Sequence, residues 1–146
     1  MMEESMKLSN ELLDFIQKSP SCYHAVENLA QTLCDTGFLE LSEGAPWRLQ
    51  RGGRYFIRRN LSSLLAFKIP EGEIRGFQIA ASHSDSPTFY VKNDALEGDK
   101  RYVRLAVEGY GGMNCASWLD RPLTVAGRAV VKTAQGVESR LVYLDR

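Results

Sequence analysis

The hydrophobic and polar positions at the start of the chain repeat with the period of an α-helix. The apolar residues of the stretch 6–18 recur three or four positions apart, at Leu8, Leu12, Leu13 and Ile16. This spacing places them on one helix face, so a helix is predicted over Met6–Lys18. The pair Ser19–Pro20 ends that helix, because the residue before a proline is driven out of the α region.

The next stretch predicts a second helix, beginning near Ser21. Its apolar stripe consists of Val26, Leu29, Ala30 and Leu33. Gly37 follows the stripe and supplies the left-handed conformation that commonly caps a helix at its C-terminal end. The first third of the chain is therefore predicted to be helical.

After Gly37 the pattern changes to β-branched and aromatic runs separated by Gly, Pro or Asn, which is typical of strands. The runs are "RYFIRRN", "SLLAFKI", "GFQIAAS", "TFYVKN", "YVRLAVEGY", "LTVAGRAVVKT" and "GVESRLVYLDR". A turn at Pro70, Glu71 and Gly72 is expected to join the second and third runs. Helices followed by strands predict an α/β protein, α+β within these residues.

The strands outnumber the helices that could cover them, and the chain stops on strand-like sequence. Two interpretations stay open on the pattern alone. The chain is a small α+β domain whose last strand is terminal, or it is the N-terminal piece of a longer protein.

Composition narrows the classes of function. The chain has 146 residues, and 18 Lys and Arg balance 18 Asp and Glu, so the net charge is zero. No basic surplus exists to neutralise phosphates, which argues against nucleic acid as a partner. The local basic run "RLQRGGRYFIRRN" alternates with apolar residues, which favours a solvated strand face.

The cysteines and the apolar runs bear on location. The chain has three cysteines and no C-x-x-C pair, which argues against a cysteine zinc site and suits reduced thiols in the cytoplasm. The N-terminus is acidic and polar, and no run approaches the about 18 apolar residues of a membrane span. We expect a soluble cytoplasmic protein with no membrane partner.

The stretch "AASHSDSPTFYVKND" holds the first chemically interesting pair, His83 and Asp85. In extended backbone, residues two apart lie on one face. Imidazole is a common zinc ligand, and a nearby carboxylate can orient the ligand set. A hydrogen-bonded structural pair explains the same residues. Ser84 and Ser86 are too close to His83 in sequence to form a serine-hydrolase triad locally.

Two further features have structural explanations. His24, the only other histidine, lies in the predicted first turn of the second helix, which favours a capping or packing role over metal binding. The stretch "EGYGGMNCASWLDRPLTVAGR" is glycine-rich, but its spacing fits neither a P-loop nor a dinucleotide fingerprint. A tight turn followed by a loop anchored by Trp118 is the interpretation that composition favours.

Three segments in order resemble the aspartyl aminopeptidase family of dinuclear zinc exopeptidases. "SPSCYHAV" resembles the family's opening Ser-Pro-x-Pro-Tyr/Phe-His-Ala-Val run, and "ASHSDSPTFYVK" resembles its His-Thr-Asp-Ser-Pro metal segment. "YGG" followed by "SWLDRPLTVAGRAVVK" resembles its Trp-Phe-Asp-Arg segment. The departures are Cys22 for Pro, Ser84 for Thr and Leu119 for Phe. "RPL" in place of "RDL" leaves acidic-residue specificity open.

The resemblance implies a metal-dependent aminopeptidase that removes N-terminal residues from peptides. It makes His83 a zinc ligand and Asp85 the catalytic carboxylate that supports the ligand set. It implies two Zn²⁺ per active site, with other divalent metals as alternatives, and a homo-oligomer. Family chains are about three times longer, so the general base and the remaining ligands lie beyond Arg146. The fragment alone is therefore expected to be inactive.

The resemblance also implies a domain boundary. Residues 1–115 are expected to belong to the catalytic α/β sandwich domain, and residues 116–146 to begin an inserted β-rich dimerisation domain. The rival hypothesis is a non-catalytic binding or assembly module whose last strands form a subunit interface. A gene that continues into further metal ligands would favour the enzyme.

Overall fold

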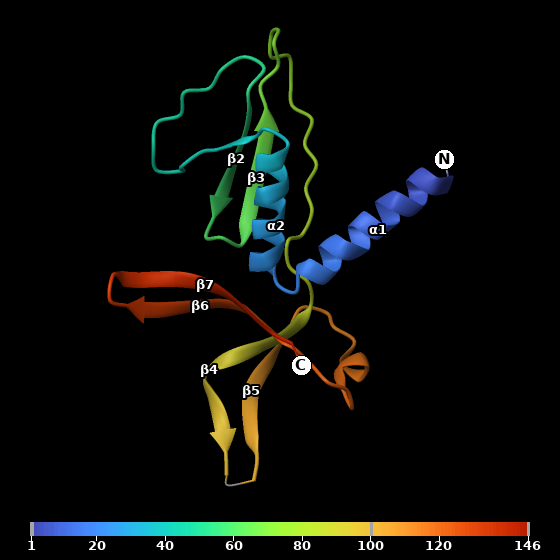
Figure 1. Cartoon of the computed structure of the whole chain (residues 1–146), viewed down its shortest axis with the longest axis vertical. Coiled ribbons are helices and arrows are strands. Elements are labelled where there is room, and N and C mark those ends of the chain that lie inside the picture. The colour runs from blue at the N-terminus through green and yellow to red at the C-terminus, as the bar shows by residue number, and fades with distance from the viewer. Residues whose placement is uncertain (1, 100, 146) are drawn as a thin grey trace. The chain divides into compact units, whose positions relative to one another are not determined.

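Two helices begin the chain in the computed structural model, which describes residues 2–99 and 101–145 (Figure 1). Helix α1 spans Met2–Lys18, so it begins four residues before the predicted start and ends where predicted, and helix α2 spans Cys22–Asp35. The described residues form two compact units. The first combines residues up to Ser84 with residues from Thr124 onward, and the second is Asp85–Leu123.

Helix α2 is capped at both ends by local chemistry. The Ser21 hydroxyl accepts a hydrogen bond from the backbone N–H of His24 at 3.4 Å, which satisfies one of the unpaired donors of the first turn. At the other end Gly37 adopts φ +82°, and its N–H donates to the Cys34 carbonyl at 2.9 Å. The N–H of Phe38 donates to the Leu33 carbonyl, which completes a Schellman motif. Both predicted ends of this helix are thus confirmed.

A three-stranded sheet follows in the first unit. Strand β1 (Leu39–Glu40) pairs in parallel with β2 (Arg54–Arg59), and β2 pairs antiparallel with β3 (Ser63–Lys68). Helix α2 lies along this sheet (Figure 1). The contact buries Val26 of the helix and Phe56 of β2, which are 1% and 0% exposed. This helix–sheet contact is the centre of the unit's hydrophobic core.

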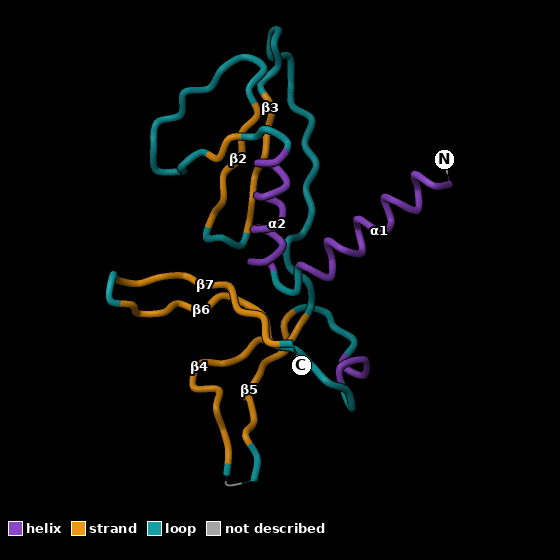
Figure 2. The backbone as a smooth tube through the Cα atoms, viewed as in Figure 1, coloured by secondary structure: helices purple, strands orange, loops and turns teal. Residues whose placement is uncertain are grey.

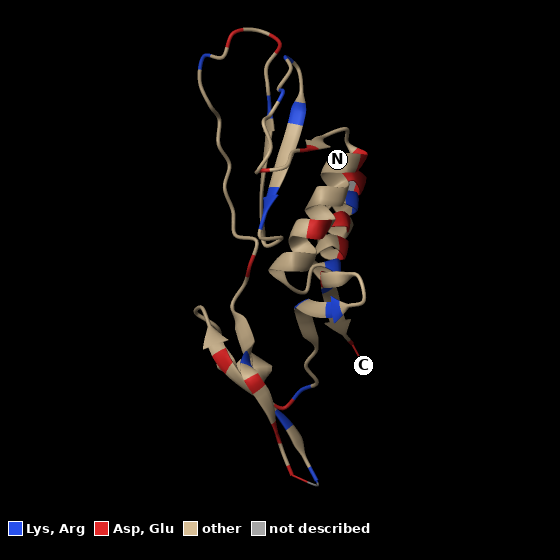
Figure 3. Ribbon diagram, turned by 90° about the vertical axis from the view of Figure 1, so that its left-hand side faces the viewer, with Lys and Arg blue, Asp and Glu red and all other residues tan. Residues whose placement is uncertain are grey.

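Two of the three arginines of β2 are paired with glutamates. The Arg58 guanidinium lies 2.6 Å from Glu27 of α2 and 2.7 Å from Glu40 of β1, so it ties three elements together. Arg59 pairs with Glu43 in the same way. Acidic and basic residues both occur along α1 (Figure 3). Two arginines of the basic run seen in the sequence, Arg58 and Arg59, are therefore charge-compensated, and the Arg54 guanidinium donates to the Thr36 carbonyl at 3.2 Å.

A β-hairpin completes the first unit. Strands β6 (Val125–Thr133) and β7 (Gly136–Leu144) pair antiparallel, with Thr133 opposite Gly136 at the turn. Two ring contacts attach the hairpin to α2. The Arg128 guanidinium lies 5.0 Å from the Tyr23 ring centroid, and Tyr143 meets the His24 ring edge-on at 6.4 Å. The sequence predicted both strands.

The second unit consists of one antiparallel ribbon and a short loop. Strands β4 (Thr88–Gly98) and β5 (Val103–Tyr110) pair with a register shift between Val91 and Leu96; we call them the β4–β5 ribbon. A 3₁₀ turn, η1 (Cys115–Trp118), follows. Trp118 packs edge-on against Phe89 at 5.4 Å. Trp118 thus anchors the loop, as the composition predicted.

One predicted strand is absent. The run "GFQIAAS", residues 76–82, has no strand pairing among the described residues, and Figure 2 shows the chain there as loop after β3. Phe77 and Ile79 are 86% and 87% exposed. A strand is defined by its hydrogen-bonded partner as well as by its own residues. The prediction failed because no described segment supplies that partner.

The remaining predictions of secondary structure are confirmed, and the mix of helices and strands is that of the predicted class. The three cysteines form no disulfide bond with one another. Among the described residues, no helix is long and apolar enough to cross a membrane.

Candidate functional site

His83 lies in an irregular segment at the end of the first unit. Its residue is exposed, so the imidazole is accessible and is not packed into the core. The neighbouring Ser84 hydroxyl donates a hydrogen bond to the Ser62 carbonyl at 2.8 Å. Ser62 closes the β2–β3 turn, where Asn60 and Leu61 have positive φ angles. This bond anchors the segment beside His83 to the three-stranded sheet.

The backbone bends at Ser84, between His83 and Asp85. The side-chain alternation of an extended strand therefore does not fix the direction of Asp85 relative to His83. This differs from the sequence-based expectation that both side chains share one strand face. The orientation of Asp85 must come from its own contacts.

Asp85 begins the second unit and is half-buried. The hydroxyl of Tyr110, the last residue of β5, donates a hydrogen bond to Asp85 Oδ2 at 2.5 Å. Tyr110 in turn stacks on Tyr90 of β4, with ring centroids 4.5 Å apart and planes 11° apart. The Asp85 carboxylate is thus held by the end of the β4–β5 ribbon at which β4 begins and β5 ends.

This contact changes the electrostatics of the tyrosine. The hydrogen bond to Asp85, and then the negative charge of that carboxylate, raise the pKa of Tyr110 to about 12. Both effects favour the protonated phenol. At neutral pH Tyr110 therefore keeps its proton and acts as the donor in this pair.

A tight turn holds Tyr110 in place. Gly111 has φ +72°, and a Cβ atom there would lie 3.4 Å from the Cβ of Pro87. Thr88 pairs with Tyr110 across the ribbon, so the chain leaving Asp85 and the chain leaving β5 run side by side. The positive φ favours glycine at this position, and a Cβ atom would make an ordinary van der Waals contact with Pro87.

The described residues contain no cluster of three or more His, Cys, Asp or Glu side chains that could hold a metal ion. Zinc sites in proteins take three or four protein ligands. His83 is an exposed residue, and its imidazole is of the type that zinc sites use. Additional donors are required to complete such a site.

The other polar residues singled out in the sequence have structural contacts. The His24 ring Nδ1 lies 2.8 Å from the Ser21 hydroxyl, and burial lowers the pKa of this histidine. Together with its backbone bond to Ser21, this agrees with the capping role. Ser84 is engaged with the Ser62 carbonyl, which agrees with excluding it as a nucleophile.

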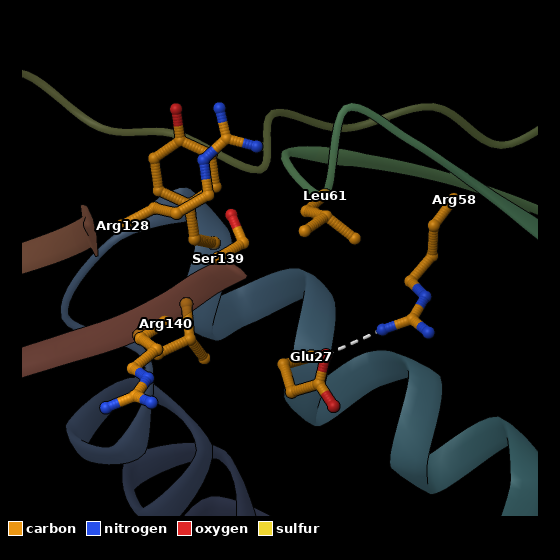
Figure 4. A pocket seen from close by; sticks show the side chains of 8 residues that line it. Glu27, Arg58, Leu61, Arg128, Ser139 and Arg140 are labelled. Carbon is orange, nitrogen blue, oxygen red and sulfur yellow. Dashed lines mark hydrogen bonds and ion pairs between the residues drawn. The ribbon is translucent and has the colours of Figure 1, made fainter. Parts of the chain in front are cut away.

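A pocket of about 280 Å³ lies elsewhere in the first unit (Figure 4). Its guanidinium groups are partly compensated, since Arg58 binds Glu27 and Arg140 lies 3.0 Å from Glu138. Neither His83 nor Asp85 lines it. Residues drawn and labelled in Figure 4 are Glu27, Arg58, Leu61, Arg128, Ser139 and Arg140.

Sequence reasoning missed Tyr110 and Tyr90. Tyr110 was visible as the aromatic residue within "EGYGG", but 25 positions separate it from Asp85. The strand register that brings the two residues together is set by the β4–β5 pairing. Their contact therefore could not be read from the motif.

Comparison with known proteins assigns the chain to a class, the zinc metalloproteases. A family model described as "Aminopeptidase I zinc metalloprotease (M18)" matches residues 15–146. The chain belongs to this family, which confirms the resemblance found in the sequence.

Two curated relatives show how much of a family member the chain represents. It is 40% identical over 150 residues to the probable M18 family aminopeptidase 2 of Clostridium acetobutylicum, covering 99% of this chain and 35% of that protein. It is 42% identical over 149 residues to the aspartyl aminopeptidase of Dictyostelium discoideum, covering 99% and 31%. The chain spans about a third of the length of these relatives.

Solved structures agree on the fold. The chain matches a protein in the cryo-EM structure of the Ape4 and Nbr1 complex with a TM-score of 0.89 and 40% identity, covering 93% of this chain and 27% of that one. It matches the mApe1 dodecamer of S. cerevisiae with a TM-score of 0.85 and 33% identity, covering 93% and 33%.

Proposed function

We propose that this chain is the N-terminal part of a zinc-dependent aminopeptidase that removes N-terminal residues from peptides. The observation that carries the proposal is the family match over residues 15–146, which includes both the His83–Asp85 segment and the "SWLDRPL" segment. The exposed imidazole of His83 supports it, because a metal and its other donors can approach that ring.

In this proposal His83 is a zinc ligand, and Asp85 is the carboxylate that orients the ligand set. Bound zinc supplies Lewis acidity at the scissile carbonyl and to the attacking water. His83 contributes a neutral nitrogen donor from an accessible segment that the Ser84–Ser62 bond anchors. Asp85 contributes a carboxylate whose orientation the hydrogen bond from the Tyr110 hydroxyl fixes.

The remaining features follow from the same proposal. The described residues bring together no group of three or more potential metal ligands, so we propose that the 146-residue chain alone is inactive. Two zinc ions per site, a boundary at 115/116 between catalytic and dimerisation parts, and cytoplasmic location are further elements of the proposal. The proposed boundary at 115/116 does not coincide with a limit of either compact unit, because the units are defined only by contacts within this chain.

Substrate preference and assembly are proposed from the relatives. The Dictyostelium protein is named an aspartyl aminopeptidase, so we propose acidic N-terminal residues among the substrates. One structural neighbour is described as a dodecamer, so we propose a homo-oligomer. The peptide substrate is the only other partner that the proposal requires.

The test uses the completed enzyme, meaning the product of the full gene in which these residues lie. Where that gene encodes these residues alone, the completed enzyme is a chimera continued by the part of the Clostridium acetobutylicum relative that follows the matched segment. Zinc binding is measured by competition with a chromophoric chelator, and activity is measured on aminoacyl p-nitroanilides. We expect His83→Ala to reduce zinc affinity at least about tenfold and to abolish hydrolysis.

His24→Ala is the matched control, because it removes the other histidine and leaves His83 in place. We expect its zinc affinity and activity to stay within twofold of the wild type. A completed enzyme that neither binds zinc nor hydrolyses any aminoacyl substrate would overturn the proposal and favour the binding-module hypothesis. The isolated 146-residue chain is expected to show no hydrolysis in the same assay.

A further inference from the structure

We propose that Tyr110 is a positioning residue that sets the orientation of the Asp85 carboxylate for metal binding. The proposal rests on the proposed function and adds a residue to it. Its observation is the hydrogen bond of 2.5 Å from the Tyr110 hydroxyl to Asp85 Oδ2, both within the second unit.

The local backbone and the packing around Asp85 do not by themselves fix the orientation of its side chain. The backbone bends at Ser84, so the side-chain alternation of a strand does not set the direction of Asp85 relative to His83. Asp85 is only half-buried, so close packing alone does not lock its side chain. A charge-assisted hydrogen bond to a carboxylate is short and directional. The Tyr110 hydroxyl thereby selects one direction for this carboxylate.

Tyr110 is itself rigidly placed. Its ring stacks on Tyr90 with the planes 11° apart, and its backbone pairs with Thr88. The next residue, Gly111, packs its backbone against Pro87. The stacked Tyr90 ring, the backbone pairing with Thr88 and the following turn therefore hold Tyr110 in one position. Its hydroxyl in turn holds the Asp85 carboxylate.

A purely structural role explains the contact less well. Tyr110 is 38% exposed, so the pair lies at the surface of its unit. Surface hydrogen bonds contribute little net stability because water competes for both partners. A hydrogen bond between Tyr110 and Asp85 at the surface is therefore better explained by orientation of a functional carboxylate than by stabilisation of a hydrophobic core.

The experiment compares Tyr110→Phe with the matched control Tyr102→Phe in the completed enzyme. Phenylalanine keeps the ring that stacks on Tyr90 and removes only the hydroxyl. Tyr102 precedes the opposite end of the β4–β5 ribbon and is 69% exposed. We expect Y110F to lower both zinc affinity and kcat about tenfold with KM within twofold, and Y102F to leave all three unchanged.

A double-mutant cycle tests whether Tyr110 acts through Asp85. In an Asp85→Ala background we expect Y110F to cause no further loss of zinc affinity, because the carboxylate that it orients is gone. The melting temperature of the metal-free protein is measured for each variant. We expect it to be similar for Y110F and Y102F, which separates positioning from stability.

Three results would overturn the proposal. Zinc affinity and kcat of Y110F equal to those of Y102F would remove Tyr110 and leave the proposed function intact. If Y110F lowers zinc affinity in the Asp85→Ala background as much as it does in the wild type, Tyr110 does not act through Asp85 and has a structural role. A wild-type enzyme without zinc binding would remove both proposals. Should Y110F fail to fold, Tyr90→Ala, which removes the stacked ring, is expected to lower the same two quantities.

Discussion

Gly37 shows how a single residue decides the end of an element. Its φ of +82° lies in the left-handed region, and a Cβ atom there would meet nothing within 4 Å. Any cost of a side chain at this position therefore arises from backbone conformation alone. We expect Gly37→Ala to lower the free energy of unfolding of the completed enzyme's N-terminal part by about 1 kcal/mol.

The measurement is the urea midpoint, followed by circular dichroism. Gly44→Ala is the control, because Gly44 also has open space around it and has no positive φ. We expect this control to stay within about 0.5 kcal/mol of the wild type. Equal destabilisation by both substitutions would contradict the cap assigned to Gly37.

At the same scale, some residues of the candidate site could be identified from the sequence and one could not. His83 and Asp85 could be singled out from sequence because they lie in one contiguous segment of metal-binding residue types. Tyr110 could not, because its contact with Asp85 depends on the register of a ribbon. A motif reports residues near each other in the chain, and pairing brings distant ones together.

At the scale of elements, segment 76–82 is the informative case. Its residues are typical of a buried strand, yet Phe77 and Ile79 are more than four-fifths exposed. Exposed apolar side chains on an extended segment mark a site for pairing and burial. We infer that the completed enzyme supplies a strand beside this segment.

Amide hydrogen exchange tests this inference. We expect the amides of 76–82 to exchange about a hundredfold more slowly in the completed enzyme than in the isolated chain, because pairing makes their exchange depend on opening of the structure. The amides of β2 are paired within this chain, so their change in exchange reports the general loss of stability of the isolated chain, and the slowing at 76–82 is measured relative to theirs. Equal exchange of 76–82 in both proteins would show that this segment remains unpaired.

At the scale of the whole molecule, the chain buries little apolar surface. The buried hydrophobic side chains among the described residues are those of Ala25, Val26, Ala30, Tyr55, Phe56 and Ala95. The apolar face of α1 is open, with Leu8, Leu12 and Leu13 each more than half exposed. An exposed apolar helix face of this kind is typical of a surface that packs against another element.

We therefore expect the isolated 146-residue chain to bind the dye ANS strongly and to melt without a sharp transition, because exposed apolar surface and a small core give both signatures. The completed enzyme, measured by the same fluorescence and calorimetry, is expected to bind little dye and to melt cooperatively. A sharp transition and weak dye binding for the isolated chain would contradict this expectation.

The sequence by itself determined both helices, their caps, six of the seven strand-like runs and the family. These follow from local periodicity, from turn residues and from short motifs, all of which act between near neighbours in the chain. The tertiary structure decided that segment 76–82 has no partner here, that the backbone bends at Ser84, and that Tyr110 holds Asp85. Those outcomes depend on which distant segments pair, and pairing is a property of the assembled fold that local patterns do not carry.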